Sequence, residues 1–261
     1  MDIPRISASS YSNTAPLVWP FLYGTLHGKV EIILDNAPAR SAELLSQGRV
    51  GSALVPVIAY HNIDDVKLVP GVCVGAREKV RSVCLVTKGM DLSEAKSVSL
   101  DTSSRTSVAL SKIIFREFLD AEPEWRDAAP NVEAMLGASD AALIIGDPAL
   151  ALSRDARYRV FDMVELWRGA TGLGFIFAMW MTRDQAGIDF AAARDEGLAH
   201  AADIAANYAG QIGLSSDEMK SYLTENITYT PDESMLEGME LYFSLAEKHG
   251  LIKANRPLNF T

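Results

Sequence analysis

The sequence predicts an α/β fold with mainly parallel strands, followed by a helical tail. Short apolar runs rich in β-branched residues alternate with helical patterns over the first two thirds of the chain. From Gln185 onward the pattern changes to successive helices separated by Gly, Ser and Thr-Pro. A length of 261 residues with 48% hydrophobic residues is enough for a sizeable core.

Seven short apolar runs bounded by turn residues are expected to form strands. They cover residues 5–9, 30–34, 51–57, 80–87, 97–100, 141–145 and 176–181. A helix is expected over 38–47, because Pro38 suits a first helical turn and Gly48 follows its end. A second helix is expected over 106–119, after a polar turn.

The tail is expected to hold helices over 184–212, 215–225 and 231–249, which cover the lobe that contains the N-terminus. We place two chain crossings near residues 86–91 and 177–183. Residues 1–90 and 180–261 then form a discontinuous lobe, and 91–179 an inserted middle lobe. This layout resembles the type 2 periplasmic binding protein fold, whose two α/β lobes close on a ligand by hinge motion. The architecture alone does not define a chemistry.

Charge and cysteine content narrow the functional classes. With 24 Lys and Arg against 34 Asp and Glu, the net charge of −10 repels nucleic acid and anionic membranes. Cys73 and Cys84 lack metal-type spacing, so we expect buried free thiols and neither a metal nor an organic cofactor. The opening segment has no basic or apolar leader and no run reaches about 18 apolar residues, so a cytoplasmic protein without membrane contact is expected.

Four segments carry a family resemblance through their order and spacing. They are ISASSYSNTAPL (6–17), VRSVCLVT (80–87), LDTSSRTS (100–107) and IGDPAL (145–150), the last followed by ELW (165–167) and TGLGFIFAMW (171–180). Together they resemble the chorismate dehydratase family of the futalosine route to menaquinone, a relative of 1,4-dihydroxy-6-naphthoate synthase. The chain departs from the family at Val57 and at Gly174, where the family often has a serine and a proline, so neither position is assigned a ligand role.

Asn13 and Ser82 are the expected catalytic residues. Asn13 follows a strand in a turn closed by Pro16, so its amide either projects toward a cleft at the strand end or bonds its own turn. The resemblance implies the first of these. Ser82 lies near the first crossing without a histidine close in sequence, which favours a hydrogen-bond donor over a nucleophile.

The turn at 102–107 is the best candidate anion site, because hydroxyls and free main-chain N–H groups at a helix start attract a carboxylate. Simple helix capping by Ser103 or Ser104 is an alternative, and both can hold together. Asp147 is expected to be a structural N-cap. The expected substrate-binding residues are Tyr11, Ser103, Ser104, Arg105, Thr106, Ser107 and Gly146.

The resemblance implies a lyase that eliminates water from chorismate to give 3-[(1-carboxyvinyl)oxy]benzoate. We expect Asn13 and Ser82 to orient the ring while the substrate's own enolpyruvyl carboxylate, or a bound water, removes the proton. Two alternatives are a non-catalytic solute-binding protein of the same fold and 1,4-dihydroxy-6-naphthoate synthase. The expected partner is a small dicarboxylate, chorismate, and the oligomeric state is left open.

Overall fold

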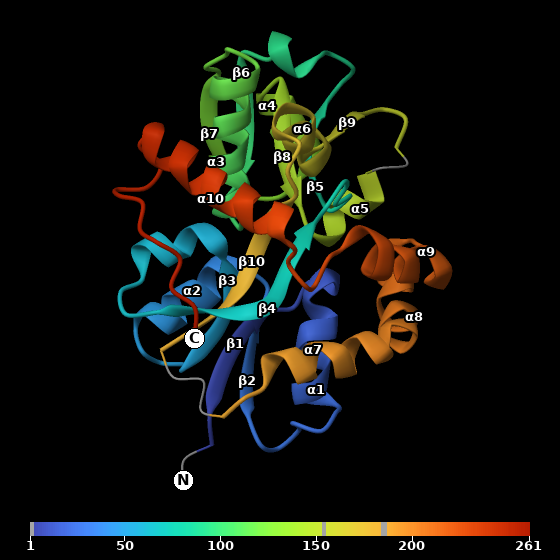
Figure 1. Ribbon diagram of the computed structural model, residues 1–261. Helices are drawn as coiled ribbons and strands as arrows, with labels where there is room; N and C mark the ends of the chain where they lie inside the picture. The colour runs from blue at the N-terminus through green and yellow to red at the C-terminus, as the bar shows by residue number, and fades with distance from the viewer. Residues whose placement is uncertain (1–2, 153–154, 184–186) are drawn as a thin grey trace.

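The computed structural model describes residues 3–152, 155–183 and 187–261. Its strands form two five-stranded sheets in two lobes, and helices of the C-terminal tail run alongside them (Figure 1). The expected two-lobed α/β class is therefore confirmed, with a first lobe built from both ends of the chain and a second lobe inserted between them.

The first sheet contains the N-terminal strands and one late strand. Its order is β2 (Glu31–Asp35), β1 (Arg5–Ser9), β3 (Ser52–Pro56), β10 (Phe175–Thr182) and β4 (Lys67–Ala76). Two helices, α1 (Ala15–Leu22) and α2 (Pro38–Ser46), connect its first three strands. As expected, α2 starts at a proline and ends just before Gly48, whose φ is +67°.

The second sheet has the order β7 (Glu124–Ala128), β6 (Ser97–Asp101), β8 (Ala141–Ile145), β5 (Val83–Thr87) and β9 (Arg159–Asp162). Its helices are α3 (Thr106–Ile113), α4 (Val132–Ala138), α5 (Asp147–Leu152) and α6 (Met163–Thr171). A π-helical turn, Ile114–Phe118, continues α3, so the helix expected over 106–119 is present.

The expectation of mainly parallel strands is wrong, because four of the eight pairings among the described strands are antiparallel. All four involve β5 or β10. These are the strands that the chain enters directly from the other lobe. Without a crossover helix, each starts at the junction and runs away from it, whereas the other strands end there.

The crossings also fall at other positions than expected. The strand β5 was expected in the first lobe but pairs in the second sheet, and β10 begins before the expected boundary at residue 180. The chain therefore passes between the sheets within residues 77–82 and 172–174. An apolar run looks the same whichever sheet it joins, so its sequence pattern does not reveal the lobe.

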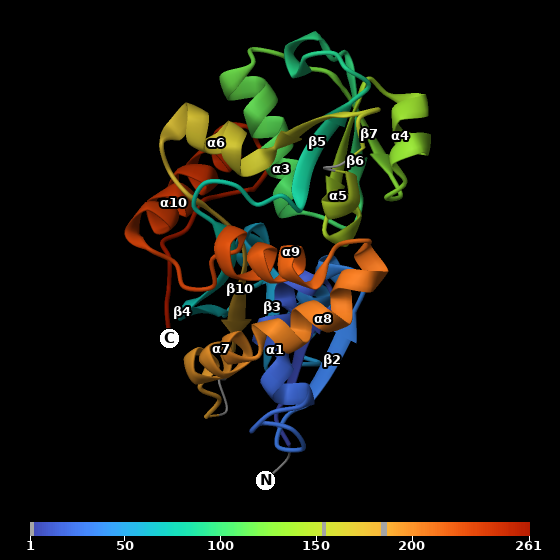
Figure 2. The ribbon, with the colours of Figure 1, turned by 90° about the vertical axis from the view of Figure 1, so that its right-hand side faces the viewer.

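The tail consists of α7 (Phe190–Ala199), α8 (Ala201–Ile212), α9 (Ser216–Ser221) and α10 (Glu233–Lys248). It covers the first lobe through contacts of α7 with α1, and Gly197 permits this because a Cβ there would lie 1.7 Å from the carbonyl oxygen of Pro16. The tail also reaches the second lobe, where α10 packs on α3 and α8 on α5 (Figure 2). The single helix expected over 184–212 is two helices divided at His200, and its expected start at Asp184 lies outside the described residues.

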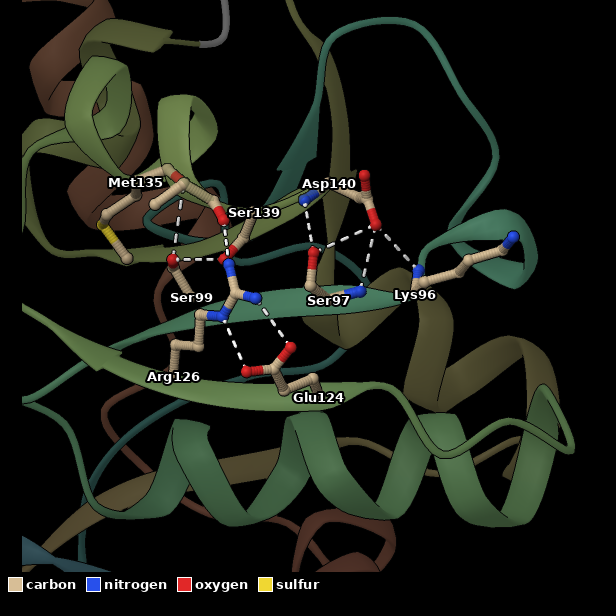
Figure 3. Close-up of polar contacts among 9 residues, drawn as sticks. Lys96, Ser97, Ser99, Glu124, Arg126, Met135, Ser139 and Asp140 are labelled. Atoms are coloured by element: carbon tan, nitrogen blue, oxygen red, sulfur yellow. Dashed lines mark hydrogen bonds and ion pairs between the residues drawn. The ribbon is translucent and has the colours of Figure 1, made fainter.

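A polar cluster joins the amino-terminal ends of β6 and β8 (Figure 3). One carboxylate oxygen of Asp140 accepts from the main-chain nitrogens of Lys96 and Ser97 at 3.0 and 3.1 Å and from the Ser97 hydroxyl at 3.0 Å. These bonds, led by the one from Lys96, lower the pKa of Asp140. The cluster fixes the start of two neighbouring strands at the edge opposite the lobe junction, so we assign it a structural role.

Candidate functional site

A pocket lies between the two sheets, at the carboxyl ends of β1, β3 and β8. Its cavity volume is about 70 Å³, within about 570 Å³ of empty space that includes open solvent. Apolar walls and a few hydroxyl and amide groups line it: Ser9, Tyr11, Asn13, Thr14, Pro38, Leu54, Pro56, Val74, Val83, Ser104, Thr106, Ser107, Ile145, Gly146, Phe177 and Ala178. Such a lining suits a compact ring compound with polar substituents.

Most of the expected site residues surround this pocket. Those in its lining are Tyr11, Asn13, Ser104, Thr106, Ser107 and Gly146. They come from both lobes and from segments far apart in the sequence. Ser82, Ser103 and Arg105 do not line the pocket. Of the two positions where the chain departs from the family, Val57 is fully buried in the core and Gly174 packs beneath Met235 of α10, so both lie outside the pocket lining.

Ser82 is fully buried behind the pocket wall. Its main-chain oxygen accepts a 2.7 Å hydrogen bond from the nitrogen of Gly146, which does line the pocket. Arg105 is exposed and lines a separate outer hollow together with Lys112. Its guanidinium lies 3.9 Å from the carboxylate of Glu43.

Asn13 sits in a 3₁₀ turn, Ser12–Thr14, between β1 and α1. Thr14 closes this turn, because its hydroxyl donates to the main-chain oxygens of Ser9 and Tyr11 at 2.7 and 2.8 Å. The Asn13 side-chain oxygen is shielded from solvent and has no hydrogen-bond partner among the described residues. The alternative in which this oxygen bonds its own turn is therefore not what the structure shows.

Tyr11 and Gly146 pack together across the junction. Gly146 has φ +68°, and a Cβ there would lie 3.0 Å from two carbons of the Tyr11 ring. The Tyr11 hydroxyl is 3.5 Å from the hydroxyl of Ser103. Burial raises the pKa of Tyr11, so its phenol is protonated at neutral pH and can donate a hydrogen bond.

The loop before α3 combines capping with pocket lining. The hydroxyl of Ser104 accepts a 3.1 Å bond from the nitrogen of Ser107, so the capping alternative holds for Ser104 while both residues line the pocket. The nitrogen and hydroxyl of Ser103 donate to one carboxylate oxygen of Asp101 at 2.9 and 2.6 Å. The other oxygen of Asp101 is buried without a partner in the described part of the chain, and burial raises the pKa of this carboxyl.

Asp147 links the two lobes. It is the first residue of α5 in the second lobe, and its carboxylate accepts from the hydroxyl of Ser12 and, at 3.3 Å, from the nitrogen of Ser12 in the first lobe. Burial raises the pKa of Asp147, and the two bonds from Ser12 oppose that rise. We expected Asp147 to be a structural N-cap, but it lies inside the first turn of α5 and its carboxylate faces the other lobe, so its structural role is a contact across the junction.

Two tyrosines of the tail reach the site, which sequence reasoning missed. The Tyr229 hydroxyl donates to the main-chain oxygen of Asn13 at 2.9 Å. Tyr222 is fully buried beside Asn13 and Ser82. Both tyrosines lie beyond the segments that resemble the family, and neither stands in a pattern that would have marked it.

Among the described residues, no group of three or more His, Cys, Asp or Glu side chains is arranged so that it could bind a metal ion. Cys73 and Cys84 are free, fully buried thiols, as expected, and burial raises the pKa of both. Within the described ranges, no helix has the length and apolar character needed to span a membrane.

Two α/β lobes around a pocket with contacts from both sides define a two-lobed fold of the periplasmic binding protein type. Solved structures share this fold. Protein AF1704 from Archaeoglobus fulgidus has a TM-score of 0.74 at 17% identity, covering 95% of this chain and 98% of that one. The periplasmic aliphatic sulphonate binding protein SsuA from Escherichia coli has a TM-score of 0.65 at 17% identity, covering 96% and 88%.

A family model described as menaquinone biosynthesis matches residues 4–248. A chorismate dehydratase from Thermus thermophilus is 31% identical over 96% of this chain and 95% of its own length. The chain belongs to the menaquinone biosynthesis family.

Proposed function

We propose that this protein is a hydro-lyase that converts chorismate to 3-[(1-carboxyvinyl)oxy]benzoate. Similarity to the chorismate dehydratase along nearly the whole chain supports the proposal. The observation that carries it is that residues from all four segments that resemble the family, including Asn13, Val83, Thr106 and Gly146, meet around one pocket. A pocket at the ends of strands from two lobes is where a small acid would be enclosed.

The reaction needs positioning more than strong acid or base chemistry. Chorismate carries a ring carboxylate, an enolpyruvyl ether with a second carboxylate, and a hydroxyl next to the ether-bearing carbon. When the C–H bond at that carbon breaks, its electron pair completes the aromatic ring. The C–O bond to the hydroxyl breaks, and the released hydroxide takes up the proton as water. Because aromatisation favours this outcome, the site must mainly hold the ring and exclude competing reactions.

The site residues suit this task. Leu54, Val74 and Phe177 give the ring an apolar wall, while the Asn13 amide can donate to the leaving hydroxyl or a carboxylate. Main-chain N–H groups at the start of α3 favour a negatively charged group. Ser82 supports the wall through its bond to Gly146. We propose that the substrate's enolpyruvyl carboxylate or a bound water accepts the proton.

Incubation of the purified protein with chorismate tests the proposal, with product followed by mass spectrometry. We expect loss of one water and appearance of the aromatic product. Binding of chorismate without conversion would contradict the proposal and favour the non-catalytic solute-binding alternative.

Two variants and one control test the residue roles. Asn13→Asp keeps the side-chain size but adds a charge that repels a dicarboxylate, so we expect turnover to be lost; near-normal turnover would rule out the assigned role. Ser82→Ala keeps the main-chain bond to Gly146 and removes a hydroxyl that lies outside the pocket lining. A lower kcat at unchanged KM would show that this hydroxyl assists the transition state, and unchanged constants would rule that role out. Ser46→Ala removes an exposed hydroxyl of α2 that donates to the carbonyl of Glu43, away from the pocket lining, and should leave both constants unchanged.

A further inference from the structure

Tyr222 presents a buried hydroxyl that the fold does not explain. Its side chain is fully buried, and no described residue makes a hydrogen bond of good geometry with its oxygen. Asn13 Oδ1 is shielded and unpartnered in the same way. Unpaired buried polar atoms are uncommon because each loses its bonds to water. Two of them beside one pocket indicate a functional arrangement.

The two groups are neighbours with complementary chemistry. Burial raises the pKa of Tyr222 far above its ordinary value, and the nearby side chains of Ser82 and Asn13 oppose that rise. The phenol is therefore protonated and can donate, whereas an amide oxygen can only accept.

Tyr222 also occupies an unusual backbone position. It opens a π-helical turn, Tyr222–Asn226, directly after α9, and such turns are frequent at functional sites. A few residues later, Tyr229 donates to the main-chain oxygen of Asn13 at 2.9 Å. The tail thus fixes the backbone of Asn13 through one tyrosine and places the second beside its side chain.

We infer that Tyr222 is a positioning residue for the elimination, whose hydroxyl holds Asn13 Oδ1 so that the amide NH₂ faces the pocket. Tyr222 is not in the pocket lining, so it acts through Asn13 and not on the substrate. The expected effect on turnover rests on the proposed function. The orientation of the Asn13 amide does not, because it is a property of the free protein.

The kinetic test combines Tyr222→Phe, Asn13→Ala and the double variant. Removing only the hydroxyl should lower kcat about tenfold or more, because a misplaced contact group acts on the transition state, while KM changes less than about threefold. In the Asn13→Ala background the same change should have less than about a twofold effect. Tyr60→Phe is the matched control, since it removes a buried hydroxyl that bonds the Pro257 carbonyl at 2.8 Å, away from the pocket.

Equal losses in both backgrounds, or a Tyr222→Phe variant with normal kcat, would overturn the inference. A wild-type protein that does not convert chorismate would instead refute the proposed function. NMR separates the two cases: the side-chain ¹⁵N–¹H signals of Asn13 in the free protein should shift in Tyr222→Phe and not in Tyr60→Phe. Unchanged Asn13 signals in both variants would overturn the inference whatever the activity.

Discussion

Replacing Gly146 by alanine should disturb the pocket and the lobe junction together. An alanine at φ +68° pays roughly 1–2 kcal/mol for the left-handed backbone. Its Cβ would also lie 3.0 Å from two Tyr11 ring carbons, and such overpacking costs about 1–3 kcal/mol. The two effects add to about 2–5 kcal/mol, which at about 2–4 °C per kcal/mol lowers Tm by roughly 4–20 °C.

Gly172→Ala separates the two contributions. Gly172 has φ +77° at the end of α6, and a Cβ there meets nothing within 4 Å, so only the backbone cost of roughly 1–2 kcal/mol applies. Urea unfolding of both variants gives the difference, and KM for chorismate should rise only in Gly146→Ala, because Tyr11 must move. Equal losses of stability, or an unchanged KM in Gly146→Ala, would refute the assigned contact between Gly146 and Tyr11.

Three further predictions concern other parts of the molecule. Ser12→Ala removes a hydroxyl that stabilises the Asp147 carboxylate across the lobes and should cost about 1.5–3 kcal/mol at pH 7 in urea unfolding. Burial raises the folded pKa of Asp147 above its unfolded value of about 3.9, so this group's contribution to stability falls as pH rises. The Ser12 hydroxyl opposes that rise because it stabilises the ionised carboxylate, so the Ser12→Ala loss should shrink near pH 4 as the carboxyl takes up a proton; a loss independent of pH would contradict this. Cys73 and Cys84 should react with a thiol reagent only after unfolding, and rapid labelling of the native protein would show that the core opens. Arg105→Gln removes an exposed ion pair and should change stability by less than about 0.5 kcal/mol and KM by less than about threefold, whereas a large KM increase would bring this side chain into the site.

The sequence predicts most of the structure where local pattern is sufficient. The strands β1 and β8 match their expected residues at both ends, since each is a compact apolar run bounded by polar or turn residues. The pocket lining also follows from local signals in part, because Asn13 and the loop before α3 stand at strand ends.

Tertiary context accounts for what the sequence does not reveal. The strand β4 contains Pro70 and Gly71, which indicate a turn, but it is the edge strand of its sheet, where a proline is tolerated and the pairing with β10 shifts register. The places of Tyr222 and Tyr229 depend on how the tail folds back over the junction, and helical periodicity carries no information about that path.

The position of β10 affects the order in which the two lobes fold during synthesis on the ribosome. Since β10 lies between β3 and β4, the nascent N-terminal region cannot close its sheet until residues 175–182 have emerged. The inserted lobe has all its strands by residue 162 and is free to fold earlier. Until then the flanks of β3 and β4 stay open to pairing with other chains, so this interval of synthesis is where the protein would depend most on chaperones.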